Sequence, residues 1–272
     1  MERLIFLFSL KPIVFGFIGM IISGLSFPLA GVIILRNDLI PLRYMLMHGV
    51  ILGGTLSIAF SLPMVPVVAL LNVILVFVMM AIKGKGKTLS VASTSMMVLT
   101  MGLASLVSHL FDVPSKDTLE LLWGSPFALT KTDLFMLTAI AATLTIYCIC
   151  SFRSMSAIFF DQDVASSLGI NVRLHSTIMV LVTALVIALS MKVMGALLMD
   201  ALVILPVLGV SRNSSSLKGV FIKSAITGLV LSVLGYLLAL LYNLPVSGSL
   251  SILAVAFYVL ATIINKIKRS KK

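Results

Sequence analysis

Long apolar runs, separated by short breaks with charge, glycine or proline, dominate the chain. A helix needs about 20 mainly apolar residues to cross the hydrocarbon core of a bilayer. The seventh run is short, follows Lys192 and meets Pro206, so we expect it to be broken or re-entrant. The pattern predicts an all-α, polytopic integral membrane protein with about eight to nine transmembrane helices. The nine runs are 12–35, 44–62, 64–82, 89–111, 134–152, 174–191, 194–210, 219–242 and 247–265.

Composition agrees with this pattern. Hydrophobic residues make up 60% of the chain, charged residues 11%, and the mean hydropathy is +1.20. Ordinary globular chains carry about 25% charged residues. No segment has the composition of a separate soluble domain, so we expect residues 1–272 to form a single transmembrane domain. Cys148 and Cys150 lie two residues apart in one apolar run, where their side chains would point in different directions, and no disulfide is predicted.

The distribution of lysine and arginine predicts the orientation. Cytoplasmic loops of membrane proteins hold the excess of these residues. If the tail 265–272 is inside, nine spans place 15 of the 20 basic residues on the same side. The C-terminus is therefore predicted to be cytoplasmic. The net charge of +11 indicates topology and affinity for anionic lipid headgroups, and gives no reason to predict nucleic-acid binding.

The stretch 83-KGKGKTLS-90 looks like the end of a phosphate-binding loop, but it fails as one. Such a loop needs a further glycine five residues before Gly86, where this chain has Ala81, and a strand before it. An unbroken apolar run precedes it instead. Paired intramembrane aspartates, a serine–histidine pair and a His-Glu-x-x-His motif are also missing, so an enzyme acting alone is not predicted. A transport function would need an ion gradient or a partner ATPase.

One internal stretch, 153-RSMSAIFFDQDVASSLGINVR-173, is too polar in its middle to span a membrane. Its sequence pattern predicts a short cytoplasmic helix. Asp161 or Asp163 can cap the start of this helix, and Gly169 can end it. Val164 and Leu168, with Ile170 as a further candidate, would form its apolar edge. Such a helix is suited to docking into a groove on a partner protein, or to lying on lipid headgroups.

Within this stretch, 161-DQDVASSLGI-170 resembles the coupling-helix signature Asp-Pro-Glu-x-Ala-x-Ser-Leu-Gly-Ile of the ABC-3 family, the membrane permeases of ABC-type zinc, manganese and iron importers. Gln162 and Asp163 stand where the family has Pro and Glu. The segments 195-GALLMDALVILP-206, 244-LPVSGSLSIL-253 and 122-LWGSPFAL-129 are also similar to family motifs, so the resemblance covers nearly the whole chain. The matching residues of the signature are Asp161, Ala165, Ser167, Leu168, Gly169 and Ile170.

The resemblance implies a homodimeric permease in the cell (inner) membrane of a prokaryote. A coupling helix at about 159–170 would sit on a cytoplasmic ATP-binding-cassette ATPase subunit, which hydrolyses the ATP. An extracytoplasmic substrate-binding protein would deliver the cargo, and no cofactor would be stably bound; a divalent metal ion would only pass through. The residues expected to couple to the ATPase are Asp161, Asp163, Ala165, Ser167, Leu168, Gly169 and Ile170.

The family's second span usually begins Gly-Asp-x-x-x-His, with two side chains four residues apart that can hold a divalent ion. His48 matches the histidine, but Tyr44 replaces the aspartate. Asp200 is the only acid predicted within a span, where it should face a cavity, pair with a cation such as Lys192, or be protonated. We expect His48 and Asp200 to be metal ligands in transit, with a structural hydrogen bond as the alternative for each. Zinc, which accepts nitrogen and carboxylate ligands, ranks slightly above manganese and iron.

Other possibilities follow from the same residues. Tyr44 leaves room for a metal chelate or a non-metal solute. A secondary transporter would use Asp200 to carry protons, and a membrane scaffold or sensor would use the cytoplasmic helix only to hold a partner. Methionines flank the candidate ligands and would suit a soft ion, but a role as flexible core fillers is favoured for them. These methionines are Met45, Met47, Met191, Met194 and Met199.

Overall fold

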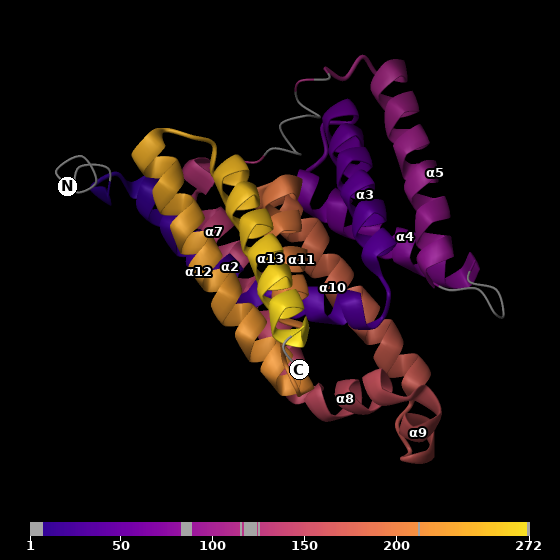
Figure 1. Cartoon of the computed structure of the whole chain (residues 1–272). Coiled ribbons are helices and arrows are strands. Elements are labelled where there is room, and N and C mark those ends of the chain that lie inside the picture. The colour runs from indigo at the N-terminus through magenta and orange to yellow at the C-terminus, as the bar shows by residue number, and fades with distance from the viewer. Residues whose placement is uncertain are drawn as a thin grey trace. The chain divides into compact units, whose positions relative to one another are not determined.

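The computed structural model describes residues 8–82, 89–114, 116, 124, 126–211 and 213–270. All regular secondary structure within these ranges is helical (Figure 1). The helices are α2 (Lys11–Arg36), α3 (Ile40–Ala59), α4 (Met64–Ile82), α5 (Leu89–Leu110), the 3₁₀ helix η1 (Pro126–Ala128), α7 (Lys131–Cys150), α8 (Phe152–Phe160), α9 (Gln162–Ser167), α10 (Val172–Met194), α11 (Ala196–Ser211), α12 (Leu217–Tyr242) and α13 (Val246–Ser270).

Eight of the described helices are long and apolar enough to cross a membrane: α2, α3, α4, α5, α7, α10, α12 and α13. They correspond to eight of the nine predicted runs, and the all-helical membrane fold is confirmed. The seventh run forms α11, which has 16 residues and is therefore only about 24 Å long at 1.5 Å per residue. This is shorter than the hydrocarbon core of about 30 Å.

The break in the seventh run lies at its start. Gly195 alone separates α10 from α11, and its φ of +89° is a left-handed conformation that glycine adopts without a steric penalty. The expected break in the seventh run is therefore at Gly195, and α11 continues through Pro206 to Ser211. Proline removes one backbone donor from a helix, and neighbouring helices in a membrane protein can compensate for that loss.

The chain divides into two compact units, one made of Met1–Val32, Trp123–Thr145 and Val193–Lys272, the other of Ile33–Leu122 and Ile146–Lys192. We call them the first and the second unit. The first holds most of α2 and α7 together with η1, α11, α12 and α13. The second holds α3, α4, α5, α8, α9 and most of α10.

Glycines allow the helices of the first unit to approach closely. A Cβ on Gly24 of α2 would lie 2.7 Å from the carbonyl oxygen of Gly228 on α12, and a Cβ on Gly228 would meet the Gly24 carbonyl. Gly31 of α2 lies against the carbonyl of Val203 on α11 in the same way. Small residues at helix contacts are a general device of membrane proteins, because van der Waals packing replaces the hydrophobic driving force there.

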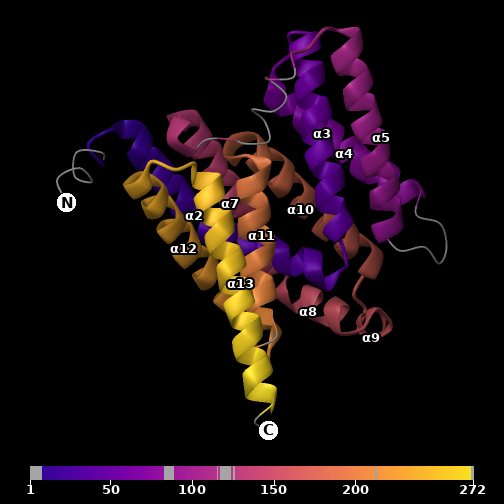
Figure 2. The same cartoon turned by 45° about the horizontal axis from the view of Figure 1, so that its top comes forward.

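In the second unit, α3 packs against both α4 and α5 (Figure 2). Gly49 and Gly53 lie on the α4 side of α3, facing Asn72 and Val68 respectively. The contact between α4 and α5 includes a hydrogen bond from the hydroxyl of Ser93 to the sulfur of Met79, at 3.0 Å. The helices α3, α4 and α5 therefore pack against one another, and α3 carries His48.

Candidate functional site

The candidate docking segment is two short helices, α8 and α9, instead of one helix over 159–170. Asp161 separates them, with an extended backbone at φ −163° and ψ 130°. Its Oδ1 accepts hydrogen bonds from the backbone N–H of Asp163 at 2.8 Å and of Val164 at 3.0 Å. A side-chain acceptor at this position satisfies amides that a helix start leaves without a partner. Asp161 is thus the cap, and its extended backbone is why the predicted helix is divided.

The far end of α9 also agrees with the sequence. Gly169 has φ +78°, and the N–H of Ile170 donates to the carbonyl of Ala165 at 3.1 Å. This is the left-handed glycine termination that the sequence predicted. The hydroxyl of Ser167 donates to the carbonyl of Asp163 at 2.9 Å, within α9.

The apolar side chains of α9 are divided between buried and exposed. Ala165 is fully buried, which anchors the helix. Leu168 is 69% exposed, Val164 is 45% exposed, and Phe160 at the end of α8 is 83% exposed. Large apolar side chains held in the open next to a capped helix are typical of an interaction surface. We call Phe160, Val164 and Leu168 the docking edge.

His48 lies in the middle of α3, in the second unit, and is half-buried. Its Nδ1 lies 2.8 Å from the carbonyl oxygen of Tyr44, one turn earlier. A carbonyl only accepts hydrogen bonds, so the neutral imidazole carries its proton on Nδ1 and presents the lone pair of Nε2. This is the arrangement in which histidine binds a metal ion, with the second ring nitrogen fixing the tautomer and the orientation.

A neighbour of this histidine was not predicted from the sequence. The guanidinium carbon of Arg43 lies 4.5 Å from the centroid of the Tyr44 ring, although Arg43 is only 7% exposed. Stacking of a cation on an aromatic face is attractive. No spacing rule predicts it, because neighbouring residues on a helix do not normally face each other. A guanidinium therefore lies against Tyr44, the residue that stands where the resemblance implies an aspartate.

Asp200 lies in the second turn of α11, in the first unit, and is half-buried. Most of α11 is buried, but Leu197, Asp200 and Leu208 are more exposed and share one face at helical spacing. Pairing with Lys192 was one of the three possibilities for Asp200, and the Lys192 side chain lies outside the described residues. His48 belongs to the second unit and Asp200 to the first.

The remaining candidates behave as packing residues. Among the described residues no group of three or more His, Cys, Asp or Glu side chains could hold a metal ion. Met45, Met191, Met194 and Met199 are almost completely buried, as core fillers are. Cys148 and Cys150 are free cysteines.

Comparison with known proteins places the chain in a family. Residues 9–265 match the model of the ABC 3 transport family. An uncharacterized membrane protein of Cyanophora paradoxa is 27% identical over 263 residues, covering 95% of this chain and 86% of that protein. The manganese import system permease protein ScaB of Streptococcus pneumoniae is 22% identical, covering 85% and 81% of the two chains. The high-affinity zinc uptake system membrane protein ZnuB of Buchnera aphidicola is 25% identical, covering 91% and 95%.

Two solved structures have a similar fold. PsaBC from Streptococcus pneumoniae in complex with Fab matches with a TM-score of 0.82 at 21% identity, covering 96% of this chain and 94% of that one. A putative metal-chelate type ABC transporter in an inward-facing conformation matches with a TM-score of 0.73 at 16% identity, covering 92% and 85%. The family match covers nearly the whole sequence, including the docking segment and both candidate ligands. This chain therefore belongs to the ABC 3 transport family.

Proposed function

We propose that this chain is the permease subunit of an ATP-binding-cassette importer of divalent metal ions. Family membership supports a transport function, and relatives whose names specify manganese import or zinc uptake support a metal cargo. The observation that carries the proposal is α9, a separately capped helix whose Leu168 is 69% exposed. The energy comes from a separate ATPase subunit that grips this helix from the cytoplasm.

The orientation follows from the same arrangement. The proposal places the C-terminus and α9 on the inner side of the membrane of a prokaryotic cell, which requires α11 to carry the chain back across the membrane between α10 and α12. The cargo arrives on the opposite face, from an extracytoplasmic binding protein. ATP binding and hydrolysis in the partner would move α9 and alternate the access of the pathway. Two copies of the permease would form a symmetric dimer, because paired ATPase subunits present equivalent grooves.

His48 and Asp200 are our candidates for ligands in transit. The Nε2 lone pair of His48 and a carboxylate oxygen of Asp200 are donors that zinc accepts readily. Manganese and iron also accept such ligands, and manganese favours oxygen donors more strongly. For this reason zinc is slightly favoured as the cargo over manganese or iron. A dimer would supply each ligand twice.

Isotope uptake tests this assignment. Cells expressing the chain with its ATPase and binding protein would be assayed with zinc, manganese and iron, comparing wild type with His48→Ala and Asp200→Asn. We expect each variant to lose ATP-dependent uptake of one metal while expression is unchanged. His175→Ala is the matched control, because His175 makes the same Nδ1 contact with the carbonyl of Asn171 but stands at the start of α10. Normal uptake by both variants would remove these side chains from the pathway.

Dependence on the ATPase is tested separately. Leu168→Glu places a charge in the docking edge and should abolish co-purification of the ATPase and uptake together. Ser166→Glu adds the same charge to the same exposed helix outside that edge and should retain most of both. Uptake that persists without any ATPase, and responds to a proton gradient, would identify a secondary transporter instead.

A metal chelate is the second candidate cargo, and Arg43 favours it. Tyr44 stands where the resemblance implies an aspartate, and the Arg43 guanidinium lies 4.5 Å from its ring, so these two side chains offer no anionic ligand to a bare cation. If the cargo is a chelate, uptake should require the chelator, and Arg43→Gln should weaken it. If the cargo is the bare ion, added chelator should only compete with uptake.

A further inference from the structure

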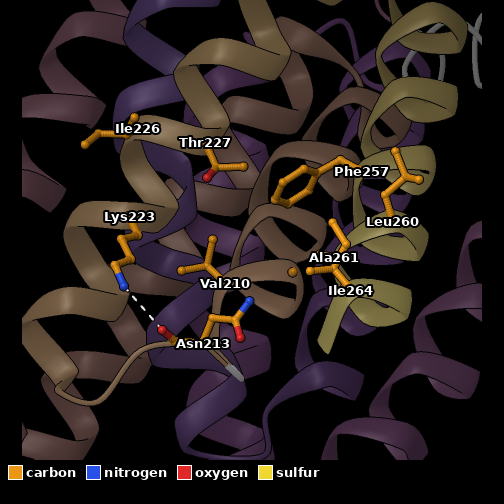
Figure 3. A pocket seen from close by; sticks show the side chains of 10 residues that line it. Val210, Asn213, Lys223, Ile226, Thr227, Phe257, Leu260, Ala261 and Ile264 are labelled. Carbon is orange, nitrogen blue, oxygen red and sulfur yellow. Dashed lines mark hydrogen bonds between the residues drawn. The ribbon is translucent and has the colours of Figure 1, made fainter. Parts of the chain in front are cut away.

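A pocket of about 550 Å³ lies between the helices α11, α12 and α13 of the first unit (Figure 3). This volume is within the range of small-molecule sites. All of the residues that line the pocket belong to the first unit. They are Gly209, Val210, Asn213, Lys223, Ile226, Thr227, Phe257, Leu260, Ala261 and Ile264.

The floor of the pocket depends on a glycine. A Cβ on Gly209 would collide with the ring of Phe257, so the absence of a side chain lets this ring lie against α11. Figure 3 shows the Phe257 ring pointing from α13 toward Val210 and Thr227. Ala261, one turn further along α13, leaves the space beside the ring open. The pocket is thus formed by two small residues around one aromatic ring.

The walls are apolar and open to the outside. Ile226, Leu260 and Ile264 are each about half exposed although they line the pocket. In a helix pair that spans a membrane, such a surface is in contact with acyl chains. The aliphatic side chains of Ile226, Leu260 and Ile264 are chemically similar to a lipid tail. The ring of Phe257 provides a large additional contact area.

A single cation marks the polar end among the lining residues. The ammonium of Lys223 donates to the backbone carbonyl of Asn213 at 3.3 Å, which holds it at the rim (Figure 3). An ammonium has three donors, so this bond leaves donors for a further acceptor. Thr227 lies one turn further on α12, on the same face. A phosphate oxygen is a suitable acceptor for the remaining N–H donors of the Lys223 ammonium.

The position of Lys223 along the helix places it at headgroup level. The helices α12 and α13 form an antiparallel hairpin whose turn begins at Asn243, with φ +56°. Roughly 30 Å of helix separates Lys223 from that turn, and a similar length separates Lys266 on α13 from Val246. This is the thickness of the hydrocarbon core. Both lysines therefore reach the same membrane surface, at the end where the C-terminus lies.

We propose that this pocket binds one anionic phospholipid from the leaflet on the C-terminal side, with its phosphate at Lys223 and one acyl chain on Phe257, Leu260 and Ile264. The net charge of +11 and the exposed Lys266 add attraction for an anionic lipid over a zwitterionic one. The site is independent of the transported cargo and does not include His48 or Asp200.

Lipid retention measures this directly. The full chain would be extracted from vesicles of equal phosphatidylglycerol and phosphatidylcholine, delipidated, and analysed by native mass spectrometry. We expect one retained phosphatidylglycerol per chain in wild type. Lys223→Gln should lower that retention about five-fold, as loss of one lysine at a charged membrane surface does. Lys218→Gln removes the same charge from an exposed residue of α12 that does not line the pocket, and should leave retention unchanged.

Filling the pocket provides an independent variant. Ala261→Phe should expel the lipid, whereas Ala256→Phe, at an exposed position of α13 outside the pocket, should not. Size-exclusion elution checks the fold of each variant. If Ala261→Phe does not fold, the phosphatidylglycerol retention of Lys223→Gln is the test of the proposal. Equal retention in all variants, equal retention of the two lipids, or disulfide cross-linking of two copies through Ile264→Cys in membranes would overturn the proposal.

Discussion

The hydroxyl of Tyr236 on α12 donates a hydrogen bond to the backbone carbonyl of Ile13 on α2, at 2.6 Å. The Tyr236 ring also lies 5.8 Å from the ring of Phe17 and 5.2 Å from that of Phe127. One side chain thus ties together three segments of the first unit that are far apart in the sequence: α2, η1 and α12.

Removing this hydroxyl should destabilise the first unit modestly. Tyr236→Phe keeps the ring contacts but loses the hydrogen bond, and such bonds contribute about 1 kcal/mol. We expect the free energy of unfolding in mixed micelles to fall by about that amount. Tyr242→Phe is the control, because Tyr242 is exposed at the end of the same helix. Equal stability of the two variants would show that the Tyr236 bond contributes nothing.

The cap at Asp161 should matter through its acceptor oxygen and not through its charge. Asp161→Ala leaves the amides of Asp163 and Val164 without their acceptor and should cost α9 about 1 kcal/mol. Asp161→Asn keeps an equivalent acceptor. We therefore expect uptake and ATPase stimulation to fall in the alanine variant and to be retained in the asparagine variant. Loss in both variants would show that the carboxylate charge itself is required.

Gly169 should be needed for its backbone conformation. A Cβ at Gly169 would meet no atom within 4 Å, but φ is +78°. Gly169→Val should strain the end of α9 by about 1–2 kcal/mol, because L-residues rarely adopt this conformation. Gly169→Asn should cost less, since asparagine tolerates it. Co-purification of the ATPase, measured for both variants, should fall only with valine; a similar fall with asparagine would indicate a steric role for the missing side chain.

The contact between Gly24 and Gly228 should be intolerant of one methyl group. Gly228→Ala forces α2 and α12 apart and should lower the free energy of unfolding by about 1–3 kcal/mol. Gly102→Ala adds the same methyl group to α5 where no atom lies within 4 Å, and should not destabilise the protein. If thermal unfolding showed Gly228→Ala as stable as Gly102→Ala, the close helix approach would be disproved.

The local elements of this protein were predictable because they depend on neighbouring residues. A run of apolar residues in a membrane must form a helix that satisfies its own backbone, so eight spans follow from hydropathy. Asp161 or Asp163 was predicted to begin α9 and Gly169 to end it, because capping acts over three or four residues, and the structure has Asp161 as the cap. A break in the seventh run was expected, but its position at Gly195 depends on a backbone φ that no local sequence pattern shows.

Sequence alone determined the helices, the polar docking segment and the identity of the candidate ligands His48 and Asp200. The tertiary structure decided which surfaces meet: Gly24 on Gly228, Tyr236 on Ile13, and the pocket at Lys223. The reason is physical. A helix is stabilised by bonds between residues four apart, whereas helix pairing in a membrane depends on shape and on contacts between residues on different helices, which no local pattern contains.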